Sequence, residues 1–276
     1  MWEKFNRKQN DDEMLMLQFY ARKMFDFSNV LFIIRMVAVI VIAIFSIINF
    51  NGLIVALISL FCVFLSWLEG KCIKNAANAR EIFDTKLFEF TIPDYAEKII
   101  KSAQKFCKKN YNEFEIQKNN TGEDEPAGVK DWYTKNDGKT ENEIIFNCQI
   151  ENTKWDEKIT KINSLIFWGV IVILFCIYII IKCKDSVLNF IIGIILASEM
   201  LVWLIQIWLE YRKYNENLQE RKNQIEIIKI KKPKKEDLIF LQKLIKERRN
   251  LKLVPFNSIH KYVKNEMHEL IKNNRS

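Results

Sequence analysis

The sequence lacks the short motifs that usually identify enzymes and metal proteins. It contains neither a GxxxxGK nor a GxGxxG phosphate-binding loop, and no nucleophile and base stand at a recognisable catalytic spacing. Its two histidines, His260 and His268, are eight residues apart and belong to no HExxH motif. We therefore expect no enzyme, no metal site and no cofactor.

Paired cysteines and a removable leader are missing as well. The first 27 residues are polar and lack the basic start, apolar stretch and small-residue cleavage site of a signal peptide. The six cysteines show no CxxC spacing and are expected to be free thiols; they stand at positions 62, 72, 107, 148, 176 and 183.

Long apolar runs are what the sequence does have, although a mean hydropathy of −0.08 conceals them. Crossing a bilayer core of ~30 Å takes ~20 mostly apolar residues in a helix, the form in which backbone groups pair within lipid. Four runs meet or nearly meet that length: 28–50, 53–68, 164–181 and 187–209. The sequence predicts an all-α membrane protein whose four transmembrane helices form two hairpins with a cytosolic helical stalk.

The apolar runs divide the chain into five parts. We expect an N-terminal cytosolic or interfacial helix, the first hairpin, a cytosolic helical insert, the second hairpin and a basic cytosolic helical tail, with bounds 1–27, 28–68, 69–163, 164–209 and 210–276. In the first part, Leu15, Phe19 and Met24 are expected to rest on the membrane surface. The helix that follows the second run is expected to continue until Pro93, and Thr140 with Glu143 predicts a capping box.

Charge placement predicts the orientation. The turn between the first two runs carries no charge, whereas lysines and arginines cluster beside the other ends of the runs. By the positive-inside rule, both termini and the insert are expected to be cytoplasmic. The tail has 18 basic against 9 acidic residues and holds the whole excess of +8. Anionic lipid of the inner leaflet, or an anionic ligand or partner, would attract it.

Three polar residues within the predicted spans are candidates for gating: Arg35, Glu199 and Gln206. Glu199 lies ~15 Å from the cytosolic end of its span, where an unpaired charge costs at least ~2.5 kcal/mol. Arg35 lies close enough to the interface to snorkel, or to reach toward Glu199. The two residues would latch the bundle, line a water path, or only fix helix packing. No span carries a fully polar stripe, so we expect an aqueous path to need oligomerisation or rearrangement.

Three motifs stand in order within the insert. The first is Phe83-Asp84-Thr85, the second is Lys130-Asp131-Trp132-Tyr133, and the third fits the pattern CQxxNxxWD with Cys148, Gln149, Asn152, Trp155 and Asp156. Together with the 2+2 arrangement of spans, they resemble the S-4TM family, the SMODS-associated four-transmembrane effectors. The resemblance covers most of the chain and departs from the pattern at Ile150, where a basic residue is expected.

The resemblance implies a pore-forming effector of bacterial anti-phage systems of the CBASS type, located in the inner membrane and activated by a cyclic oligonucleotide. Permeabilising that membrane would kill the infected cell. The expected partners are the lipid bilayer, the cyclic oligonucleotide and further copies of the chain, with no DNA or RNA polymer.

The insert supplies the candidate ligand-binding residues. Trp132 and Tyr133 would stack on a base, Lys86 or Lys130 would meet a phosphate, and Gln149 or Asn152 would read a base edge. Alternatively, these residues only pack and cap the stalk. Two other functions remain open. A scaffold would recruit a partner without conducting ions, and a small transporter would show an internal repeat, which the two hairpins do not.

Overall fold

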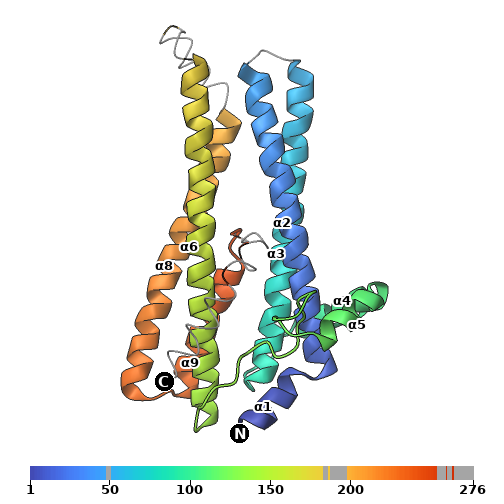
Figure 1. Ribbon diagram of the computed structural model, residues 1–276, viewed down its shortest axis with the longest axis vertical. Helices are drawn as coiled ribbons and strands as arrows, with labels where there is room; N and C mark the ends of the chain where they lie inside the picture. Colours follow the sequence, from blue (N-terminus) through green and yellow to red (C-terminus); the bar gives the residue numbers. More distant parts are fainter. Residues whose placement is uncertain (48–50, 183–185, 187–197, 254–258, 260–262, 264–276) are drawn as a thin grey trace. The chain divides into compact units, whose positions relative to one another are not determined.

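The computed structural model describes residues 1–47, 51–182, 186, 198–253, 259 and 263. Within these residues the chain is helical, and the only β pairing is an isolated bridge between Thr121 and Lys130. The described helices are α1 (Trp2–Gln9), α2 (Asp12–Ile47), α3 (Gly52–Leu87), α4 (Ala96–Lys109), α5 (Tyr111–Asn119), α6 (Glu141–Lys182), α8 (Ser198–Lys231) and α9 (Lys235–Arg249) (Figure 1). The predicted all-α class is confirmed for this part of the chain.

The chain divides into two compact units. Unit 1 comprises Met1–Phe27, Lys71–Trp155 and Tyr214–Leu251, and unit 2 comprises Ser28–Gly70, Asp156–Lys213 and Lys252–Ser276. Helices α2, α3, α6 and α8 each contribute residues to both units. The boundaries fall close to the ends of the predicted apolar runs, so the division follows the change from apolar to charged sequence.

Unit 2 exposes its apolar side chains. Leu53, Leu60 and Val63 of α3 are 67–69% exposed, and Leu165 of α6 is 75% exposed. Such a surface is unfavourable in water and suits lipid. Helices α2, α3 and α6 are each long and apolar enough to cross a membrane. The predicted fourth span begins at residues 187–197, outside the described residues, as do most of the two hairpin turns.

Aromatic side chains occupy the interior of unit 2. The Trp203 ring of α8 lies 5.9 Å from Phe32 of α2 and 5.7 Å from Phe167 of α6, measured between ring centroids. Phe167 in turn contacts Tyr211 of α8, with centroids 6.5 Å apart. These contacts join α2 of the first predicted hairpin to α6 and α8 of the second.

Unit 1 has the opposite pattern, with apolar side chains inside. Its core draws residues from seven helices, among them Phe5, Leu17, Ile82, Ala103, Ile144, Ile228 and Leu241. Leu15 and Phe19 belong to this core and are almost fully buried, while Met24 packs against it. The expectation that these three residues rest on the membrane surface is therefore wrong, because the protein itself covers them.

Local chain signals set the helix ends. Helix α3 ends at Leu87, before Pro93, because Glu89 adopts a left-handed conformation with φ 56° and the Phe90 N–H donates to the Thr85 carbonyl at 2.9 Å. The predicted capping box at the start of α6 is confirmed. The Glu143 N–H donates to Thr140 Oγ1 at 3.2 Å, and the Thr140 N–H donates to Glu143 Oε2 at 3.2 Å.

Candidate functional site

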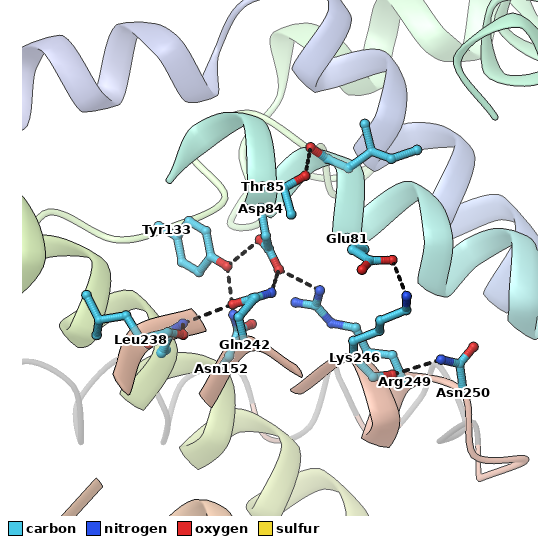
Figure 2. A network of polar contacts seen from close by, with 12 residues as sticks. Glu81, Asp84, Thr85, Tyr133, Asn152, Leu238, Gln242, Lys246, Arg249 and Asn250 are labelled. Atoms are coloured by element: carbon cyan, nitrogen blue, oxygen red, sulfur yellow. Dashed lines mark hydrogen bonds and ion pairs between the residues drawn. The ribbon is translucent and has the colours of Figure 1, made fainter. Parts of the chain in front are cut away.

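A buried carboxylate organises the polar interior of unit 1. Asp84 of α3 is 0% exposed and accepts three side-chain hydrogen bonds (Figure 2). Its Oδ1 accepts from the Tyr133 hydroxyl at 2.7 Å, while its Oδ2 accepts from Gln242 Nε2 at 2.7 Å and from Arg249 Nη1 at 2.6 Å. The charge of Arg249 and the two neutral donors together offset the cost of burying the carboxylate.

Tyr133 connects this carboxylate to the loop and to α6. Its hydroxyl accepts a hydrogen bond from Asn152 Nδ2 at 2.7 Å, and its backbone N–H donates to Gln9 Oε1 at 3.0 Å. Burial raises the pKa of the Tyr133 phenol well above its ordinary range, and the Asp84 carboxylate acts in the same direction. The phenol therefore stays protonated and serves as a donor to Asp84.

Gln149 extends the network to α9. Its side chain is 0% exposed, and its Nε2 donates to the Leu238 carbonyl at 2.8 Å and to Gln242 Oε1 at 3.1 Å. Three of the predicted ligand-binding residues, Tyr133, Gln149 and Asn152, are thus brought together. Inside the protein, Gln149 binds α9 directly, while Asn152 donates to the Tyr133 hydroxyl, which in turn donates to Asp84 of α3.

The other three predicted ligand-binding residues lie apart from this network. Lys86 forms an ion pair with Glu13 of α2. Lys130 is exposed, and its backbone N–H donates to the Asn120 carbonyl at 3.0 Å. Trp132 is partly buried and stacks against Arg80 of α3, with 4.2 Å between the guanidinium carbon and the ring centroid.

A second polar cluster lies inside unit 2. Arg35 of α2 and Glu69 of α3 are both buried and form an ion pair at 2.9 Å. Lys252, which follows α9, donates from Nζ to the Ser66 carbonyl and to the Ser66 hydroxyl, both at 3.2 Å. The Lys252 backbone N–H donates to Glu210 Oε2 of α8 at 3.1 Å. We call Arg35, Glu69, Glu210 and Lys252 the charge cluster.

The members of the charge cluster act on one another, and two of them, Glu69 and Lys252, line a small cavity. Glu69 is attracted by Arg35 and Lys252 and repelled by Glu210. The cavity beside it is lined in part by Asn163 and Tyr211, whose side chains are hydrogen-bonded to each other at 3.2 Å. The cluster therefore joins α2, α3 and α8 through the segment that carries Lys252.

The three predicted gating residues have different surroundings. Arg35 contacts Glu69, a partner that the sequence analysis did not assign to it. Gln206 is exposed on α8. The Glu199 side chain lies outside the described residues, so a contact between Arg35 and Glu199 stays a prediction.

Sequence reasoning predicted a basic helical tail but missed the polar contacts that the tail makes. Gln242 and Arg249 lie seven residues apart in α9, on the helical face that carries the buried Leu238 and Ile245. The sequence did carry a sign of these contacts, because polar residues occupy positions of an amphipathic helix that face the core. Glu69 and Lys252 gave a weaker one, since Glu69 directly follows a predicted apolar run and Lys252 is one of 18 basic residues in the tail.

Comparison with known families returned one match. The chain matches the family described as "SMODS-associating 4TM effector domain" over residues 3–274. No curated protein and no solved structure matched.

The Asp84 network predicts a loss of stability for Tyr133→Phe. The substitution leaves Asp84 Oδ1 without a donor and Asn152 without its acceptor, so the free energy of unfolding is expected to fall by ~1–3 kcal/mol. Chemical denaturation in detergent, followed by circular dichroism, measures the change. Tyr111→Phe is the matched control, because Tyr111 is 60% exposed and should change stability by less than ~0.5 kcal/mol. Equal stability of both variants would contradict the role of the network.

Proposed function

The chain belongs to the SMODS-associating 4TM effector family, and from that membership we propose that it permeabilises the bacterial inner membrane when a cyclic oligonucleotide reaches its cytosolic part. Family membership makes it a membrane effector associated with SMODS systems. Opening the membrane and sensing the nucleotide are the proposed steps.

We propose four spans, with both termini, the insert and the tail on the cytosolic side. The three described apolar helices and the exposed apolar side chains of unit 2 support a membrane location. The positive-inside rule supports the orientation. Unit 1, with its water-compatible surface and apolar core, would then lie in the cytosol and receive the signal.

The charge cluster is the observation that carries the proposal. It joins elements of both hairpins in one unit, and its Lys252 follows Arg249 by only three residues. Arg249 is bound to Asp84 in unit 1, so a shift of α9 would reach Lys252 through two intervening residues. Removing Lys252 would weaken the cluster, let the hairpins separate and give water a path past Arg35, Glu199 and Gln206. Assembly of several copies would complete that path.

On the ligand side, the predicted contacts fall into two groups. Lys86, Lys130 and Trp132 have exposed or partly exposed side chains and can meet a ligand directly, Lys86 in exchange for its ion pair with Glu13. Tyr133, Gln149 and Asn152 are engaged with α9 and with Asp84, so they would reach a ligand only as that network opens. Ligand binding and retention of α9 would then be competing uses of the same side chains.

The proposal predicts that Lys252→Met leaks without a signal. Loss of the ammonium removes its attraction to Glu69 and its hydrogen bonds to Ser66, contacts worth about 1.5–3 kcal/mol, so the open population is expected to rise by about ten- to a hundredfold. Dye release from liposomes containing the full chain measures it.

The control for this experiment is Lys243→Met, which removes the same charge from the exposed face of α9. It should leave basal leakage unchanged. Suppose that Lys252→Met leaks no more than wild type while wild type does respond to a cyclic nucleotide. That result would rule out the charge cluster as the contact that keeps the bundle closed. A wild-type chain that binds a cyclic nucleotide and never leaks would instead indicate a scaffold.

The predicted gating residues give a separate test. Glu199→Gln and Arg35→Ala are expected to change the conductance of activated protein in planar bilayers, because each removes a charge from the proposed path. Arg35→Ala should also raise basal leakage, since it leaves the buried Glu69 carboxylate without its ion-pair partner. Unchanged permeability in both variants would contradict the proposed path.

A further inference from the structure

Arg80 is a cation that has no polar partner among the described residues. Its guanidinium has five N–H donors, yet within the described part of the chain it forms neither a hydrogen bond nor an ion pair, and its buried Nε is among the polar atoms left unsatisfied. Its contacts are aromatic: the guanidinium carbon lies 4.2 Å from the Trp132 ring centroid and 5.5 Å from that of Phe25. A partly buried guanidinium without hydrogen-bond acceptors has lost hydration free energy, and no polar contact in the described part of the protein offsets that loss.

Charges of both signs surround Arg80. Burial lowers the pKa of the Arg80 guanidinium to about 9, Arg249 and Arg22 act in the same direction, and Asp84 and Tyr133 oppose them. The Asp84 carboxylate accepts from Tyr133, Gln242 and Arg249, and no hydrogen bond joins it to Arg80 among the described residues. An anion entering this region would meet the unused donors of Arg80 and the attraction of Arg249 and Arg22, against the repulsion of Asp84.

The loop that carries Trp132 is held in place without Arg80. Arg22 Nη1 donates to the carbonyls of Ala127 and Gly128 at 2.8 and 2.9 Å. Gly128 packs so closely that a Cβ there would lie 1.8 Å from the Asn120 carbonyl oxygen. The loop itself therefore positions the indole. The contact between the indole and Arg80 is not needed to hold the loop, so it can serve another role.

We infer that Arg80 and Trp132 form the binding site for a phosphate group of a nucleotide, with the guanidinium meeting the phosphate oxygens and the exposed part of the indole meeting a base. A planar guanidinium matches phosphate oxygens in bidentate fashion, and an indole face accepts any base. This inference rests on the proposed function, and it differs from the predicted ligand set in making Arg80 the principal contact.

The site also suggests how binding reaches α9. Arg80 stands one helical turn before Asp84 on α3, and Arg249 repels it. A bound phosphate adds negative charge that attracts Arg249 and competes with Asp84 for it. Binding would therefore weaken the ion pair that fixes the end of α9.

The first experiment uses inorganic phosphate as the probe and thermal unfolding of the full chain in neutral detergent as the readout. Phosphate should raise the Tm of wild-type protein above that in sodium chloride of equal ionic strength, and should not do so for Arg80→Met. Without phosphate, Arg80→Met should be at least as stable as wild type, because it removes an unpaired cation. Lys105→Met, which removes an exposed charge from unit 1, should respond to phosphate as wild type does.

Two results of this experiment would overturn the inference. A Tm of Arg80→Met several degrees below wild type without phosphate would make Arg80 a structural residue. Equal stabilisation of Arg80→Met and wild type by phosphate would place the anion elsewhere. Neither result depends on whether the protein opens a membrane.

The second experiment titrates the same proteins with a panel of cyclic di- and trinucleotides and with vesicles of phosphatidylglycerol. A bound cyclic nucleotide should lose at least about tenfold in affinity with Arg80→Met and with Trp132→Leu, while Trp132→Leu keeps its response to inorganic phosphate.

Unchanged nucleotide affinity in Arg80→Met overturns the inference. Stabilisation by the vesicles through Arg80, with no nucleotide bound, overturns the nucleotide assignment in favour of a lipid headgroup. If wild type responds to phosphate through Arg80 but to no nucleotide and no vesicle, the anion site stands and the proposed signal fails.

Discussion

The buried carboxylate of Asp84 is the constraint on which unit 1 depends. A carboxylate with no exposure to water is stable only while its donors remain in place, and these donors come from the loop before α6 and from α9. The buried Asp84 carboxylate therefore depends on the position of α9. Arg249 of that helix lies 165 residues after Asp84 in the chain. An ordinary apolar contact would allow α9 to slide, whereas this set of directional bonds specifies one register.

The same long helices meet two kinds of environment. In unit 1 their apolar side chains point into a core shared by seven helices, and in unit 2 many of their apolar side chains point outward. Unit 2 also keeps the charged Arg35 and Glu69 inside, where the two side chains form an ion pair. The two patterns explain why α2 and α3 carry charged and wholly apolar stretches without a break in helical structure.

Much of the architecture could be predicted from the sequence, because it depends on local signals. Apolar run length predicted the helices of unit 2, and the pair Thr140 and Glu143 predicted the start of α6. The end of α3 was missed, since a left-handed Glu89 gives no compositional sign. The candidate sites were harder still: the partners of Asp84, Arg35 and Arg80 are distant in sequence, and a single sequence does not indicate which charged residues meet.

The charge cluster has a consequence for the ions that would cross an open bundle. With Lys252 in place, the cluster holds two positive and two negative groups and carries no net charge. Arg35, Glu69 and Glu210 remain when Lys252 leaves, and together they carry one net negative charge. A ring of such charges contributed by several copies would favour cations over anions. Across a membrane that is negative inside, an inward cation current would dissipate the membrane potential before any larger solute had to pass.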